Sequence, residues 1–106
     1  MTCKRRYTRF AIDAEVSVSL DGGVIHGRAV DIGMGGVRLT SSASIPIGAE
    51  VVLRLALPEI TGDWEIPCIV RWSDRALGAG LQFARLGADE FFGLSHLADH
   101  FRPIRV

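Results

Sequence analysis

Short runs in which apolar and polar residues alternate recur along this chain, and each run ends at a cluster of turn-forming residues. Val16, Val18 and Leu20 alternate with two serines. A period of two places the apolar side chains on one face of a half-buried strand. The same alternation returns over residues 51–57 and 64–72. A chain built from such runs is constrained to an all-β fold.

Glycine-containing turns divide the runs into about six short strands. Asp21-Gly22-Gly23 is typical of a tight hairpin, because glycine accepts the positive φ that such turns need. Strand spacings of roughly 8–12 residues predict a small antiparallel barrel or sandwich over residues 14–86. In the run 64–72 the face expected to point inward carries Ile66, Cys68, Val70 and Trp72.

The end of the chain changes from strand to helix periodicity. Apolar residues recur there at spacings of three and four, at Phe91, Leu94, Leu97, Ala98 and Phe101. This stripe predicts an amphipathic helix over residues 88–102, which Pro103 ends.

Composition limits the classes of protein that fit. With 106 residues the chain is expected to form one domain. Twelve basic and twelve acidic side chains give no net charge, which disfavours binding of DNA by global charge. Two cysteines make no disulfide framework, and Cys68 is expected to be a small core residue. We expect a cytoplasmic protein, because no apolar run approaches the ~20 residues of a membrane span and no secretory signal is present.

Enzyme motifs are missing from the sequence. It contains no GxSxG, no phosphate-binding loop and no HExxH. His96 and His100 are four residues apart on the predicted helix, but two histidines do not complete a metal site. We therefore expect neither catalysis nor a metal cofactor.

Two features remain as candidates for ligand binding. The first is a basic N-terminal arm over residues 1–10, in which Arg5, Arg6 and Arg9 surround one tyrosine. The planar guanidinium group binds a phosphate or the edge of guanine through paired hydrogen bonds, whereas most terminal charge runs are only solvated tails. The second is the turn that begins at Asp31 and continues through Gly33 and Gly36. Its glycines allow close approach to the backbone, and its carboxylate accepts hydrogen bonds.

Together these features resemble the PilZ family of cyclic di-GMP receptors. That family carries an RxxxR arm before its first strand, here Arg5 to Arg9, and then a [D/N]xSxxG turn, here Asp31-x-Gly33-xx-Gly36. Residues 70–72 and 78–83 look like the family's late hairpin. The resemblance covers nearly the whole chain and implies a single domain, a six-stranded antiparallel β-barrel with a C-terminal α-helix. It also implies a bacterial second-messenger receptor that relays the cyclic di-GMP level to a separate effector protein.

The resemblance assigns roles to individual residues. Arg5 and Arg9 would bind phosphates and guanine edges, and Arg6 would add charge or stack. Asp31 would accept from a guanine, with Gly33 and Gly36 shaping the backbone beneath it. The loose arm would become ordered over the barrel when the ligand binds.

Position 33 departs from the family pattern, since glycine stands where the family has serine. A restored serine hydroxyl is expected to tighten binding by about 0.5–1.5 kcal/mol, provided that residue 33 does not need a positive φ. The departure keeps two alternatives open: a PilZ-like adaptor that binds a protein but no nucleotide, and a small barrel that binds RNA or single-stranded DNA. The second is disfavoured by the low aromatic content, because such modules stack bases on aromatic side chains.

Overall fold

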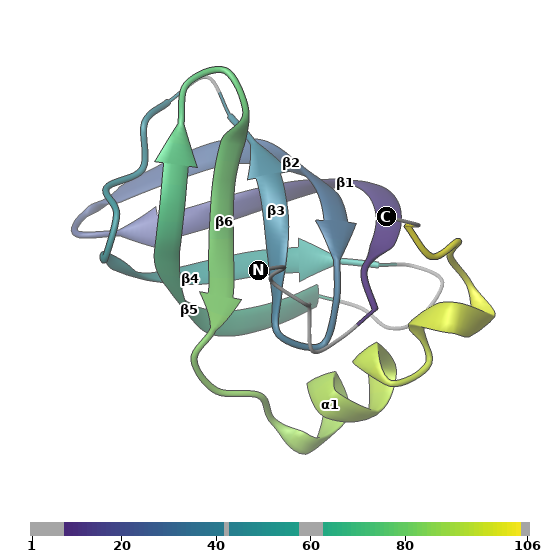
Figure 1. Cartoon of the computed structure of the whole chain (residues 1–106). Helices are drawn as coiled ribbons and strands as arrows, with labels where there is room; N and C mark the ends of the chain where they lie inside the picture. The colour runs from purple at the N-terminus through teal and green to yellow at the C-terminus, as the bar shows by residue number, and fades with distance from the viewer. Residues whose placement is uncertain (1–7, 42, 58–62, 105–106) are drawn as a thin grey trace, which may run out of the picture.

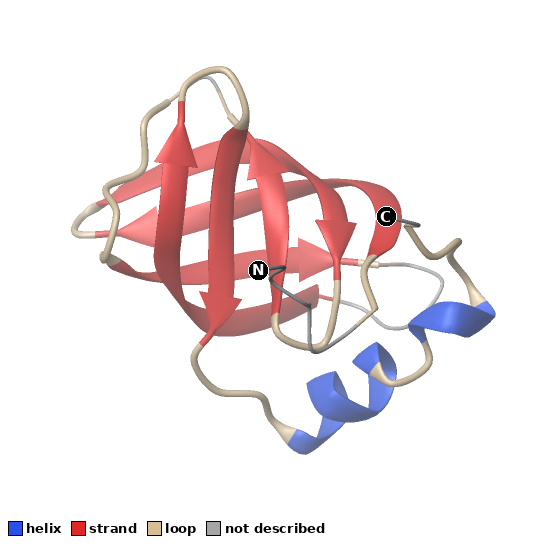
Figure 2. Cartoon of the chain, viewed as in Figure 1, coloured by secondary structure: helices blue, strands red, loops and turns tan. Residues whose placement is uncertain are grey.

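The alternating runs of the sequence form six antiparallel strands that close into a barrel (Figures 1 and 2). The computed structural model describes residues 8–41, 43–57 and 63–104. The neighbours around the barrel follow the order β1-β2-β3-β6-β5-β4. The strands are β1 (Phe10–Leu20), β2 (Gly23–Ile32), β3 (Gly36–Thr40), β4 (Glu50–Ala56), β5 (Asp63–Asp74) and β6 (Gly78–Phe83). The predicted six-stranded antiparallel barrel is confirmed, although its first strand begins at residue 10 rather than at residue 14.

The turn between β1 and β2 has the geometry that its sequence predicts. Leu20 pairs directly with Gly23, so two residues make the turn. Asp21 has φ 23° and Gly22 has φ 76°, and both positive values match the twist that a two-residue hairpin requires.

Inward-facing side chains from all six strands fill the barrel. Val18, Ala29, Leu53 and Ile66 are fully buried, as alternation with outward polar residues requires. Cys68 belongs to this core, as predicted, and burial raises the pKa of its thiol to about 12.

The inward position expected for Trp72 is wrong. The pairing between β5 and β6 shifts register between Val70 and Trp72, where β5 bulges. An extra residue reverses the side on which the following residues point. Val70 is therefore buried, whereas Trp72 is 38% exposed on the outer surface.

The C-terminal helix is shorter than its apolar stripe predicts. Helix α1 (Ala88–Leu94) begins as expected but ends after seven residues, and a single 3-10 turn, η1 (Leu97–Asp99), follows. The Ser95 hydroxyl donates to the Phe92 carbonyl (2.6 Å), a local bond that competes with continuation of the helix. Figure 1 shows α1 at one end of the barrel. Leu94 and Leu97 are buried in the barrel core, while Phe91 is exposed.

Within residues 8–41, 43–57 and 63–104, no helix is long and apolar enough to cross a membrane.

Candidate functional site

Asp31 is the only buried charged residue in the described part of the chain, and it organises the candidate site. It lies near the end of β2 and pairs across the sheet with Arg38 of β3, so both side chains lie on the same face. Only 8% of the Asp31 side chain is exposed. A carboxylate at this depth is stable only when charged or hydrogen-bonding partners surround it.

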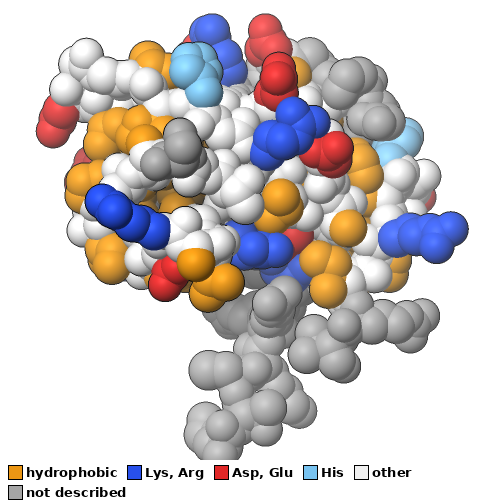
Figure 3. Space-filling view, turned by 90° about the horizontal axis from the view of Figure 1, so that it is seen from above, with side chains coloured by type: hydrophobic (Ala, Val, Ile, Leu, Met, Phe, Trp, Pro, Cys, Tyr) orange, Lys and Arg blue, Asp and Glu red, His pale blue; other side chains and the backbone are white. Residues whose placement is uncertain are grey.

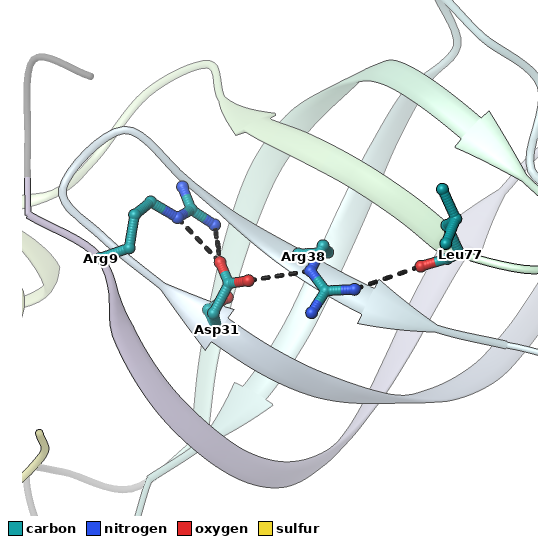
Figure 4. A network of polar contacts seen from close by, with 4 residues as sticks. All are labelled: Arg9, Asp31, Arg38 and Leu77. Atoms are coloured by element: carbon teal, nitrogen blue, oxygen red, sulfur yellow. Dashed lines mark hydrogen bonds and ion pairs between the residues drawn. The ribbon is translucent and has the colours of Figure 1, made fainter. Parts of the chain in front are cut away.

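Arg9 supplies the first partner. Its Nε donates to Asp31 Oδ1 at 2.8 Å, and its Nη2 donates to the same oxygen (Figure 4). The Arg9 side chain is only 20% exposed. The base of the arm is therefore part of the folded barrel, because β1 already begins at Phe10. The expectation that the arm is loose through residue 10 does not hold at these two residues.

Arg38 supplies the second partner and links the site to another hairpin. Its Nε donates to Asp31 Oδ2 at 2.9 Å, and its Nη1 donates to the Leu77 carbonyl at 3.3 Å (Figure 4). Leu77 lies in the turn between β5 and β6. The aspartate thus holds two guanidinium groups side by side, and one of them connects β3 to the β5–β6 turn.

These residues border a pocket of about 370 Å³ on the barrel surface. Arg71 and Trp72 of β5 form its opposite wall, and the Arg71 Nε donates to Gln82 Oε1 of β6. Its lining contains three arginines and one aspartate, and the excess of positive charge favours an anionic ligand. The Arg9 Nη2 also donates to the Asp31 backbone carbonyl at 3.5 Å, and the Nη1 of Arg9 and the Nη2 of Arg38 have no hydrogen-bond acceptor among the described residues.

The indole of Trp72 lies over its cross-strand partner Gly80 on β6. A Cβ on Gly80 would lie 2.1 Å from the Trp72 Nε1, so no other residue fits beneath this indole. The exposed part of the ring borders the pocket, where it offers an aromatic surface beside the arginines.

The two glycines of the turn have steric roles. Gly36 packs against β6, where a Cβ would lie 2.2 Å from the Leu81 carbonyl oxygen. A Cβ on Gly33 would lie 2.9 Å from the Thr8 carbonyl oxygen, so this glycine lets the base of the arm approach the turn. Gly33 does not have a positive φ, and its N–H donates to the Gly36 carbonyl at 2.9 Å. The turn therefore closes on a backbone hydrogen bond with no serine at position 33.

The structure brings Arg9, Asp31, Gly33 and Gly36 together, whereas Arg5 and Arg6 lie outside the described residues. Sequence reasoning missed Arg38, Arg71 and Trp72 as site residues. Arg38 could have been found from its position, since it follows the glycine turn on the strand that pairs with Asp31. Trp72 could not, because its strand bulges.

Other candidate chemistry finds little support in the described residues. No three His, Cys, Asp or Glu side chains gather there as a metal site would require. His96 Nδ1 lies 2.8 Å from the Phe92 carbonyl instead. The face in Figure 3 carries charges of both signs among apolar side chains rather than a continuous basic groove.

The fold and site define a small closed β-barrel with an arginine-rich surface pocket held by one buried carboxylate. Residues 4–101 match the PilZ domain, and the chain belongs to the PilZ domain family. No curated protein matches the sequence.

Solved structures of PilZ proteins share the fold. "PilZ domain with c-di-GMP of YcgR from Escherichia coli" aligns with a TM-score of 0.70 and 13% identity, over 90% of this chain and 88% of that chain. "Crystal structure of YcgR in complex with c-di-GMP from Escherichia coli" aligns with a TM-score of 0.74 and 16% identity, over 91% of this chain and 45% of that chain. The Bacillus subtilis inhibitor of motility, MotI/DgrA, aligns with a TM-score of 0.68 and 20% identity, over 88% of this chain and 48% of that chain. This chain thus spans about half the length of the longer relatives.

Proposed function

We propose that this PilZ domain is a cyclic di-GMP receptor, which relays the level of the nucleotide to a separate effector protein. The observation that carries the proposal is the Arg9–Asp31–Arg38 network at the edge of the pocket. Its arginine and aspartate at positions 9 and 31 are the ones that the family motifs mark. YcgR, whose fold this chain shares, is described with the same nucleotide bound.

The two arginines are suited to the phosphates of the ligand. Arg9 and Arg38 each donate from Nε to Asp31, and each has further N–H donors available for a ligand. Pairing with a buried carboxylate fixes the guanidinium planes before a ligand arrives, which lowers the entropy lost on binding. Arg5 and Arg6 of the arm would add further contacts to the phosphates.

Asp31 has less capacity for guanine than the family role suggests. A carboxylate offers about four acceptor positions. Arg9 occupies two of them on Oδ1, and Arg38 occupies one on Oδ2. One position remains, on Oδ2, for a single guanine N–H, whereas a paired contact across both oxygens requires Arg9 to release Oδ1. We therefore assign Asp31 chiefly to holding the two arginines in place.

Trp72 would stack on a guanine base. Its indole is fixed over Gly80 and borders the same pocket as the arginines. Stacking of a base on an aromatic side chain contributes about 1–3 kcal/mol. Arg71, held by Gln82, would contribute positive charge beside the base.

Calorimetric titration with cyclic di-GMP tests the proposal, with GMP and cyclic AMP as comparison ligands. We expect binding of cyclic di-GMP that Arg9→Ala and Arg38→Ala each weaken by about tenfold or more, the scale of a lost charge-assisted hydrogen bond. Arg28→Ala is the matched control, because Arg28 forms an exposed ion pair with Asp13 and does not line the pocket.

Each alternative function predicts a different result of the titration. A protein-binding adaptor would give no heat with the nucleotide, and a nucleic-acid module would instead bind a fluorescent oligonucleotide. Exposed Phe91 and Phe92 on α1 are apolar surface that an effector protein could contact.

A further inference from the structure

The C-terminal segment pairs with the backbone that carries Arg9. The Ile104 N–H donates to the Arg9 carbonyl at 2.8 Å, and the Ala11 N–H donates to the Arg102 carbonyl at 3.1 Å. Phe10 and Pro103 form an antiparallel bridge between these two hydrogen bonds. Residues 102–104, here called the strap, therefore run as a short extra strand beside residues 9–11.

The strap pairs with an edge of β1 that no described strand of the barrel covers. On one side, the first residues of β1 pair with the end of β2, at Phe10↔Ile32 and Ala11↔Asp31. On the other side, β4 pairs with β1 only from Val16 to Ser19. Among residues 8–41, 43–57 and 63–104, the strap is the only segment paired with this edge of β1 at residues 10–11.

The hydrogen bond from Ile104 acts directly on a residue of the proposed nucleotide site. The Arg9 side chain is bound to Asp31, while the Arg9 carbonyl accepts from Ile104. The residue before Arg9 is also held closely, because the Thr8 carbonyl packs against Gly33. Removing the strap would release one side of the backbone of residues 9–11. Arg9 lies in this segment, and its side chain must stay in contact with Asp31.

We propose that the strap is a positioning element of the nucleotide site and couples this site to the C-terminal region of the chain. The inference rests on the proposed function, because its effect is measured on nucleotide binding. Coupling between two sites is reciprocal. Displacement of the strap by a partner that contacts the C-terminal region therefore weakens nucleotide binding, and bound nucleotide holds the strap in place.

A pair of substitutions at residue 104 isolates the hydrogen bond in the full chain. Ile104→Pro removes the N–H donor. Ile104→Ala shortens the side chain but retains the N–H donor. We expect I104P to bind cyclic di-GMP about three- to tenfold more weakly than I104A, the range for one net hydrogen bond. Equal affinities, or tighter binding by I104P, would overturn the proposal. Circular dichroism of both variants checks that the barrel is folded.

A second readout does not depend on the ligand. Nitrogen-15 NMR of the Arg9 Nε–H reports its hydrogen bond to Asp31, and its exchange with solvent should be faster in I104P than in I104A. If the wild-type protein binds no cyclic di-GMP, the proposed function fails, and this exchange rate alone decides whether the strap positions Arg9. Unchanged exchange would refute the positioning role, whatever the ligand.

Discussion

Replacing Arg9 with alanine should destabilise the protein even when no nucleotide is present. The change removes both donors from Oδ1 of Asp31 and leaves a carboxylate that is 8% exposed with Arg38 as its charged partner. Leaving a buried charged group partly unpaired costs about 1.5–3 kcal/mol or more. Arg9 itself is 20% exposed and recovers side-chain entropy when removed, which favours the lower part of this range. We expect a loss of about 2 kcal/mol.

Arg28→Ala provides the control for this prediction. The Arg28 Nε lies 2.6 Å from Asp13 Oδ1, a distance as short as those around Asp31. The hydrogen bond from Arg28 lowers the pKa of the Asp13 carboxyl, but solvent surrounds both groups and screens the pair. The free energy of unfolding should therefore change far less than in R9A.

Urea denaturation at neutral pH, followed by circular dichroism, measures both variants. In thermal melts a loss of about 2 kcal/mol corresponds to a Tm lower by about 10 °C for a domain of this size. If R9A is no less stable than R28A, Arg9 is not part of the folded structure, and the argument that Asp31 needs it is refuted.

Three further predictions concern other residues of the fold. G33S and Gly33→Ala should both weaken nucleotide binding, because a Cβ at this position would lie 2.9 Å from the Thr8 carbonyl oxygen. Tighter binding by G33S would contradict this and would mean that the serine hydroxyl gains a contact with the ligand. Cyclic di-GMP should quench tryptophan emission in Trp64→Phe, which retains the pocket residue Trp72, but not in Trp72→Phe; the opposite pattern would remove Trp72 from the site. In a Cys3→Ser variant, Cys68 should resist iodoacetamide at about pH 8.5 until the protein unfolds, because burial raises its pKa to about 12. The unfolded thiol ionises near its ordinary pKa of 9.0, so stability should fall as the pH rises from there towards 12.

Alternation and turn residues predicted the strands well, because each of these signals depends only on residues that are close in the sequence. Alternation identified β1, and Asp21-Gly22 identified its hairpin, since both signals are complete within a few residues. The helix was predicted too long because apolar spacing continues past Ser95, whose side chain hydrogen-bonds to the preceding turn.

The site depends on register, which the sequence does not display. Trp72 reaches the pocket only because β5 bulges after Val70, and alternation alone places it inside. The pairing of Asp31 with Arg38 follows another irregularity, between Ala29 and Asp31 in the β2–β3 ladder. The hydrogen bond from Ile104 to Arg9 joins the two ends of the described chain, and no local pattern marks it.

The β3–β6 pairing also has a consequence for the order of folding. Strands β1 to β3 and β4 to β6 are each joined by short-range pairings, and within the described part of the chain only the β1–β4 and β3–β6 ladders connect these halves. Ladders between distant segments form late, because loop closure costs entropy before any contact repays it.

The pocket lies across one of these ladders. Arg38 and Gly80 pair across the β3–β6 ladder, with Asp31 on one side of the pocket and Trp72 on the other. Neither half of the chain can assemble the pocket alone, so a nucleotide that binds there would recognise only the closed barrel. Such a ligand would keep the β3–β6 ladder from opening. It should therefore slow unfolding while leaving the folding rate nearly unchanged.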